Sequence, residues 1–212
     1  MSAVPRTILA LETSTAQGSV LLCRGADILF EHTFSADRSH NSQLFQPLAA
    51  ALAIAKADLV VVGTGPGSYT GVRVSLAAAL GLGLALPAPV IGLPSLAAFD
   101  APDECQIVGD ARRGSFFLAT LRHGKLVGPP EVAPQEEIAA RLHGPVFTFD
   151  SAPLPFGNPT PLQPRALVLA RQAATLSEAD ISALAAVTPE PLYLRPPFIT
   201  QPRTAIRRVR QR

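Results

Sequence analysis

The 212-residue chain contains no tryptophan, one methionine and two cysteines, and only 16% of its residues are charged. Cys23 and Cys105 lie far apart and form no CxxC pair. This excludes a disulfide scaffold and a cysteine-rich zinc site. Because no secretory leader precedes "TILALE", we expect both thiols to be small apolar fillers in a reducing, cytoplasmic environment.

Acidic residues are absent from the last ten positions, which contain five arginines. Because the whole chain has a net charge of +2, residues 1–202 have a net charge of −3. A mildly acidic body with a basic tail offers no evident basic face for nucleic acid. We expect the tail, residues 197–212, to be extended. With 48% hydrophobic residues the remainder is too apolar to be disordered.

Charged residues are also missing from Val74 to Leu93, a window apolar enough to suggest a membrane span. The window is built largely from alanine, glycine and leucine, and Pro87 and Pro89 would break a helix within it. We therefore expect no contact with a membrane.

Metal and catalytic motifs are lacking as well. The four histidines have no HxxxH or HExxH spacing, and none lies near a cysteine. Glu12 and Asp110, at the ends of two apolar strands, leave two interpretations open. They would either face each other and hold Mg²⁺, or accept hydrogen bonds in turns, which we favour. We expect no catalytic residue and no metal.

The most informative motif is the glycine-rich "GTGPGSYTG" between an apolar strand and a long apolar segment. This is the setting of a phosphate-binding turn. However, the turn contains no lysine, and Ser68 stands where a dinucleotide fingerprint has its third glycine. We favour a turn shaped by Gly65, Pro66 and Gly67, with Ser68 capping the next helix. Nucleotide binding stays an alternative, and its weak candidates are Glu12, Gly65, Gly67, Ser68 and Asp110.

The order of elements predicts an α/β fold with a mixed sheet. We expect strands at 7–12, 19–24, 27–34, 58–65 and 89–93, and helices at 39–55 and 69–86. From Cys105 the pattern repeats, because "CQIVGDARRGSFFLATL" echoes "TILALETSTAQGSVLL". The echo predicts two related lobes, 1–100 and 101–196. The second is smaller and proline-rich, with helices at 134–142 and 165–176 and a short strand after Pro189.

The helix predicted at 69–86 is apolar on all sides, with Arg73 as its single charge. Small residues recur every four positions in two rows, one from Gly71 to Gly83 and one from Ala77 to Ala85. A helix that is apolar all round is buried all round, and small residues allow a second helix to approach closely. The covering element is either the chain's own core or a partner's helix, and we expect a partner.

Four motifs occur in a fixed order: "ILALETSTAQGSVLL", "GTGPGSYTGVR", "DARRGSFFLATL" and "PLYLR". In these, the chain resembles the bacterial TsaB (YeaZ) family, the dimerisation subunit of the machinery that makes threonylcarbamoyladenosine (t6A) in tRNA. The resemblance implies an actin-like ATPase (ASKHA) fold of two RNase H-like lobes, the second one reduced. The chain departs from the family at Ser115, where the family commonly has glutamate, and this departure falls in the second lobe rather than on the docking helices.

The resemblance also implies a non-catalytic scaffold subunit that activates a TsaD-like transferase, and forms a homodimer when alone. A TsaE-like ATPase is a further expected partner, and tRNA is contacted through the complex. No cofactor is required, and weak nucleotide binding at the partner interface is left open. The alternative is an autonomous ATPase or kinase of the same superfamily. The expected partner-binding residues, on the two helices of the first lobe, are His40, Leu44, Pro47, Leu48, Tyr69, Arg73, Leu76, Ala79, Leu80 and Gly83.

Overall fold

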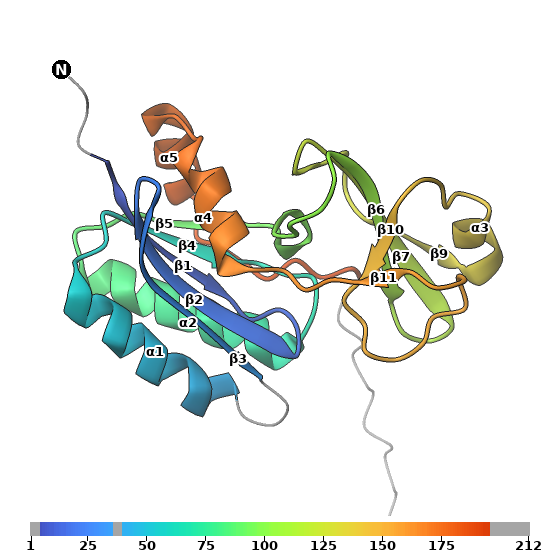
Figure 1. The fold of residues 1–212 in the computed structure, drawn as a ribbon, viewed down its shortest axis with the longest axis horizontal. Helices are drawn as coiled ribbons and strands as arrows, with labels where there is room; N and C mark the ends of the chain where they lie inside the picture. The colour runs from blue at the N-terminus through green and yellow to red at the C-terminus, as the bar shows by residue number, and fades with distance from the viewer. Residues whose placement is uncertain (1–4, 36–39, 196–212) are drawn as a thin grey trace, which may run out of the picture.

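The computed structural model describes residues 5–35 and 40–195, and of residues 40–42 only the backbone. Two sheets lie side by side; several helices pack on the first, and one short helix lies on the second (Figure 1). The predicted arginine tail and the side chain of His40 fall outside the described residues. None of the described helices is long and apolar enough to cross a membrane.

The first sheet has five strands in the order β3-β2-β1-β4-β5. β1, β2 and β3 form an antiparallel meander, whereas β4 and β5 run parallel to β1. The succession of strands and helices agrees with the prediction. The elements are β1 (Thr7–Glu12), β2 (Gln17–Arg24), β3 (Asp27–Ser35), α1 (His40–Ile54), β4 (Leu59–Gly63), α2 (Tyr69–Ala85) and β5 (Val90–Leu93).

The second sheet repeats this topology. Its central strand, β6, is antiparallel to β7 and parallel to β10, and β10 is parallel to β11. β8 and β9 both pair with β7, at opposite ends, and together replace the third strand of the meander. The bounds are β6 (Glu104–Asp110), β7 (Ser115–Arg122), β8 (Lys125–Leu126), β9 (Glu131–Pro134), α3 (Gln135–Ala139), β10 (Val146–Thr148) and β11 (Thr160–Pro161).

The second lobe is reduced in its helices. α3 has five residues, and the segment between β10 and β11 contains no helix, where the first lobe has the 17-residue α2. This segment contains three prolines, Pro153, Pro155 and Pro159, which remove backbone donors and keep it irregular. The short strand expected after Pro189 does not form. Instead, Leu192 donates a single backbone hydrogen bond to the Thr64 carbonyl, at 2.8 Å.

The first sheet is covered on both faces (Figure 1). α1 and α2 pack on one face around Leu9, Val60 and Val62. α4 (Ala166–Ala174) and α5 (Glu178–Ala185) pack on the other, around Ala10, Val61 and Ile91. The predicted division at residue 100 stays a prediction, but the helix expected at 165–176 in the second lobe lies on the first sheet. Its apolar stripe covers the face that α1 and α2 leave open.

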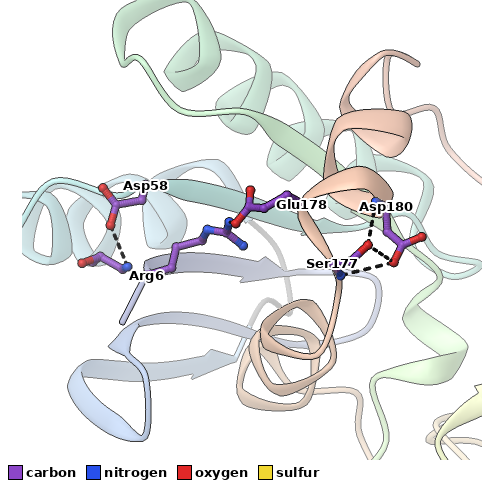
Figure 2. A network of polar contacts seen from close by, with 6 residues as sticks. Arg6, Asp58, Ser177, Glu178 and Asp180 are labelled. Atoms are coloured by element: carbon purple, nitrogen blue, oxygen red, sulfur yellow. Dashed lines mark hydrogen bonds and ion pairs between the residues drawn. The ribbon is translucent and has the colours of Figure 1, made fainter. Parts of the chain in front are cut away.

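Polar contacts fix α5 against the first sheet (Figure 2). Arg6, just before β1, pairs with Glu178 in the first turn of α5. The neighbouring Thr7 amide donates to the Asp58 carboxylate at 2.8 Å. Ser177 and Asp180 form a capping box that satisfies the first backbone donors of α5. The chain therefore returns from the second lobe to close the first one.

Candidate functional site

The glycine turn joins β4 to α2, and the turn after β1 holds it in place. The Ser68 amide donates to the Ser14 carbonyl at 2.6 Å, and the Thr13 hydroxyl donates to the Gly71 carbonyl at 2.8 Å. A Cβ on Gly67 would lie 1.9 Å from the Ser14 oxygen. Glycine is therefore required at position 67 because two backbones meet there.

Three backbone amides of this turn donate hydrogen bonds within the chain. Gly65 donates to the Ser95 hydroxyl at 2.9 Å, and Ser68 to Ser14 as described. Gly71 donates to the Ser68 hydroxyl at 3.1 Å, which makes Ser68 the N-cap of α2. A phosphate cradle needs free amides directed at the ligand. The prediction that Ser68 caps α2 is confirmed, and nucleotide binding at the turn stays the alternative.

Glu12 lies behind the turn and is fully buried. Its Oε1 accepts a hydrogen bond from the Ser14 amide at 2.6 Å, whereas Oε2 has no hydrogen-bond partner among the described residues. A Cβ on Gly63 would lie 2.0 Å from Oε2, so that glycine makes room for the carboxyl. Burial raises the pKa of Glu12, and the neighbouring Ser14 and Ser95 offset this in part. Glu12 therefore supports the turn from within.

Asp110, at the end of β6, is the counterpart of Glu12 in the second lobe. Its carboxylate accepts from the Arg112 amide at 2.6 Å and from the Arg112 guanidinium at 3.1 Å. Its own amide donates to Asp150 at 2.6 Å. Burial, with the nearby Asp110 charge, raises the pKa of Asp150.

The two strand-end acids thus serve their own turns. Of the two interpretations, the structure supports hydrogen bonding in turns over a magnesium pair. Among residues 5–35 and 40–195 no group of three or more potential metal ligands comes together.

A cavity of about 620 Å³ lies between the lobes, bounded by the turns after β1, β4 and β6 and by residues 192–195. Gly67, Ser68 and Asp110 line it, but Glu12 and Gly65 do not. Phe117 and Phe149, stacked at 5.6 Å between ring centroids, form an apolar wall. The structure therefore brings three of the five weak nucleotide candidates to one cavity and places the other two behind it.

Arg73 links α2 to the edge of this cavity. Its guanidinium carbon lies 3.8 Å from the centre of the Tyr69 ring, and it donates to the Tyr193 hydroxyl at 3.0 and 2.7 Å. The two tyrosines line the cavity. Arg73 makes no ion pair with a described carboxylate. Arg73 is therefore held by the segment around Tyr193 of its own chain.

Half of the predicted docking residues are buried within the chain, which corrects those predictions. Positions on α1 and α2 that face the sheet cannot reach a partner while the lobe is folded. These are Leu44, Pro47, Leu48, Leu76 and Ala79. Gly83 also faces inward, because a Cβ there would lie 2.6 Å from Val90. Leu80 is half-buried, and Tyr69 and Arg73 are exposed.

The outward faces of these helices contain apolar residues that the prediction missed. Leu84 is 93% exposed, Phe45 52% and Ile54 53%. Ala77 and Gly81 lie on the same side of α2 as Leu84, and nothing approaches within 4 Å of a Cβ built on Gly81. The second row of small residues in the sequence was the available signal. We call the outward-facing apolar residues of the two helices the α1–α2 face: Phe45, Ile54, Ala77, Gly81 and Leu84, which are exposed, and Leu80, which is half-buried.

Residues 35–125, less than half of the chain, match TsaD, the tRNA N6-adenosine threonylcarbamoyltransferase family. The structure of YeaZ from Pseudomonas aeruginosa superposes with a TM-score of 0.69 at 26% identity, over 89% of this chain and 100% of that one.

A second structure, an uncharacterized Pseudomonas aeruginosa protein with similarity to peptidase YEAZ, gives a TM-score of 0.69 at 27% identity, over 90% and 100% of the chains. No curated protein matches the chain. The predicted fold, actin-like with two lobes of which the second is reduced, is confirmed.

Proposed function

We propose that this chain, a TsaB/YeaZ-like protein, is the non-catalytic partner subunit of a tRNA threonylcarbamoyltransferase complex. In this proposal it docks a TsaD-like catalytic subunit and supports t6A modification of tRNA beside the anticodon. The observation that carries the proposal is the α2 part of the α1–α2 face, where Ala77, Gly81 and Leu84 share one exposed apolar side in a lobe whose sheet is already covered on both faces.

This face has the composition of an interface core. α1 contains no lysine, arginine or acid, and Arg73 is the single charge of α2. Exposed apolar patches without charges indicate sites of protein association. The small side chains of Ala77 and Gly81 would allow a partner helix to approach closely. The stretch that matches the TsaD family, residues 35–125, contains both helices.

The glycine turn supports a non-catalytic role. The Gly65, Ser68 and Gly71 amides are bonded within the chain, and the acid behind them is buried. Such an arrangement provides a rigid start for α2. The turn therefore serves the docking helix in this proposal, and catalysis belongs to the partner.

A docking subunit acts by changing its partner. Association must order or shift the catalytic subunit, and such coupling typically amounts to about 1–3 kcal/mol. One exposed face serves both the homodimer and the mixed complex in this proposal, so the two assemblies compete. The TsaD-like subunit should then convert the homodimer into a heterodimer.

The alternative is an autonomous ATPase or kinase, and the cavity of about 620 Å³ between the lobes favours it. Copurification distinguishes the partner subunit from the autonomous ATPase or kinase. A tagged chain coexpressed with the TsaD-like subunit of its own organism should retain that subunit in stoichiometric amount, and Leu84→Asp should release it. Retention by Leu84→Asp, or ATP turnover by the purified chain alone, would contradict the proposal.

A further inference from the structure

A second cavity, of about 400 Å³, lies at the junction of the lobes and shares no lining residue with the first one. Three segments form it: the end of β5 with the following 3₁₀ turn, the turn from β7 into β8, and the C-terminal half of α4. Leu93 and Leu176 pack on the core of the first lobe, and Leu126 packs on the core of the second. The cavity therefore has walls from both lobes.

Gln172 holds these walls together. Its side-chain amide donates to the Ala97 carbonyl and, at 2.9 Å, to the Gly124 carbonyl. One side chain of α4 thus ties both other segments in place. The side-chain nitrogen of Gln172 is thus satisfied within the protein, and the three segments that form the cavity are held together without a ligand.

The β7–β8 turn is also fixed. His123 and Gly124 have φ of 50° and 70° and connect the paired residues Arg122 and Lys125. Positive φ at both central positions is the geometry of a tight two-residue hairpin turn. Asp103 holds His123 through a backbone hydrogen bond of 2.6 Å and a side-chain contact of 3.5 Å. This tight turn sets the position of Lys125 at the edge of the cavity.

The walls are apolar, but the rim is cationic. Lys125 and Arg171 line the cavity, and neither makes an ion pair with any described residue. Two acids lie near the rim. Asp103 contacts His123, and Asp180 lies close enough to Lys125 for their two charges to interact. No acid lines the cavity itself. A cavity with apolar walls and two cations at its rim is complementary to a ligand that has an anionic group at one end and an apolar remainder.

We propose that this junction cavity binds a small organic anion with an apolar body and a single carboxylate or phosphate head. The head lies between Lys125 and Arg171, and the body fills the space between Leu93, Leu126 and Leu176. Because the walls belong to both lobes, the ligand fixes one lobe relative to the other. This site does not depend on the proposed partner or on the first cavity.

Titration calorimetry on the full chain tests the site with defined probes. Decanoate and decyl phosphate distinguish a carboxylate from a phosphate group. Decanol and acetate are controls, because decanol has no charge and acetate has no long apolar chain. We expect saturable binding of at least one ten-carbon anion, and none of decanol or acetate. From hexanoate to decanoate the affinity should rise about three- to fourfold per methylene until the cavity is full.

Two lysines make a matched pair of variants, because Lys56 and Lys125 are the only ones in the chain. Lys125→Gln should weaken binding about tenfold, Lys125→Gln with Arg171→Gln should abolish it, and Lys56→Gln should leave it unchanged. Thermal unfolding confirms that each variant folds. No saturable binding of either ten-carbon anion would overturn the proposal, as would equal losses in Lys56→Gln and Lys125→Gln.

Discussion

The backbone amide of Ser68 donates to the carbonyl of Ser14 at 2.6 Å, which joins the start of α2 to the turn after β1. Two turns that border the cavity of about 620 Å³ are thus bonded to one another. The contact leaves no room for a side chain at Gly67. The position of the docking helix therefore depends on this backbone contact.

Gly67→Ala should destabilise the protein by at least about 2 kcal/mol, because the new Cβ would force the two turns apart. Gly81→Ala is the matched control. Its Cβ meets nothing within 4 Å, and alanine in a helix is more stable than glycine by about 0.5–1 kcal/mol. Urea unfolding measures both changes. Equal stabilities of the two variants would show that the turns can separate freely.

Glu12→Gln should change how stability depends on pH. Burial raises the pKa of Glu12 in the folded state, so the folded protein holds this proton more tightly than the unfolded chain does. The stability from the protonated carboxyl is complete below the unfolded pKa of about 4.3. It is lost as pH rises toward the folded pKa.

The variant carries no such proton, so its stability relative to the wild type should rise with pH from about 4.3 upward. Urea unfolding of both proteins across a pH series measures this difference. A constant difference between the two proteins across the series would show that the carboxyl is ionised in the fold.

Tyr193→Phe should loosen the attachment of residues 192–195 to the first lobe. The change removes the two hydrogen bonds from Arg73, at 3.0 and 2.7 Å. Hydrogen exchange at the Leu192 amide, which is bonded to Thr64, should accelerate about two- to fivefold. Tyr69→Phe, which keeps the ring under the guanidinium, is the control and should change exchange much less. Equal exchange rates of the Leu192 amide in both variants would show that the Arg73–Tyr193 hydrogen bonds do not hold this segment.

Leu84→Asp should convert the expected homodimer into a monomer without unfolding it. Leu84 is 93% exposed, and a charge at the centre of an apolar interface should weaken association at least about 30-fold. Val187→Asp places the same charge on another exposed apolar residue and should leave the dimer intact. Sedimentation velocity checks both. A dimeric Leu84→Asp protein would place the interface elsewhere.

Ala79→Arg, in contrast, is expected to unfold the protein. Ala79 is fully buried against the sheet, so its replacement tests the core rather than the interface. This difference shows what the sequence could and could not predict. The four-residue spacing identified two rows of small residues on α2, but spacing alone does not say which row faces the sheet.

The first lobe was predictable because its patterns are strong. "TILALE" is β1 in full, and Ser68 caps α2 as expected. The second lobe was harder, since β10 and β11 contain three and two residues and no periodicity develops over such lengths. The packing of α4 on the first sheet also escaped prediction, because it depends on a long-range return of the chain. Both cavities are formed by segments distant in sequence.

The central claim is that this chain activates a TsaD-like transferase through the α1–α2 face. The most direct measurement is t6A formation in purified tRNA by the TsaD-like subunit and its adenylate-forming synthetase, with and without this chain. We expect t6A formation only when the chain is present. Leu84→Asp should abolish t6A formation, and Val187→Asp should leave it at the wild-type level. Equal modification without the chain would contradict it.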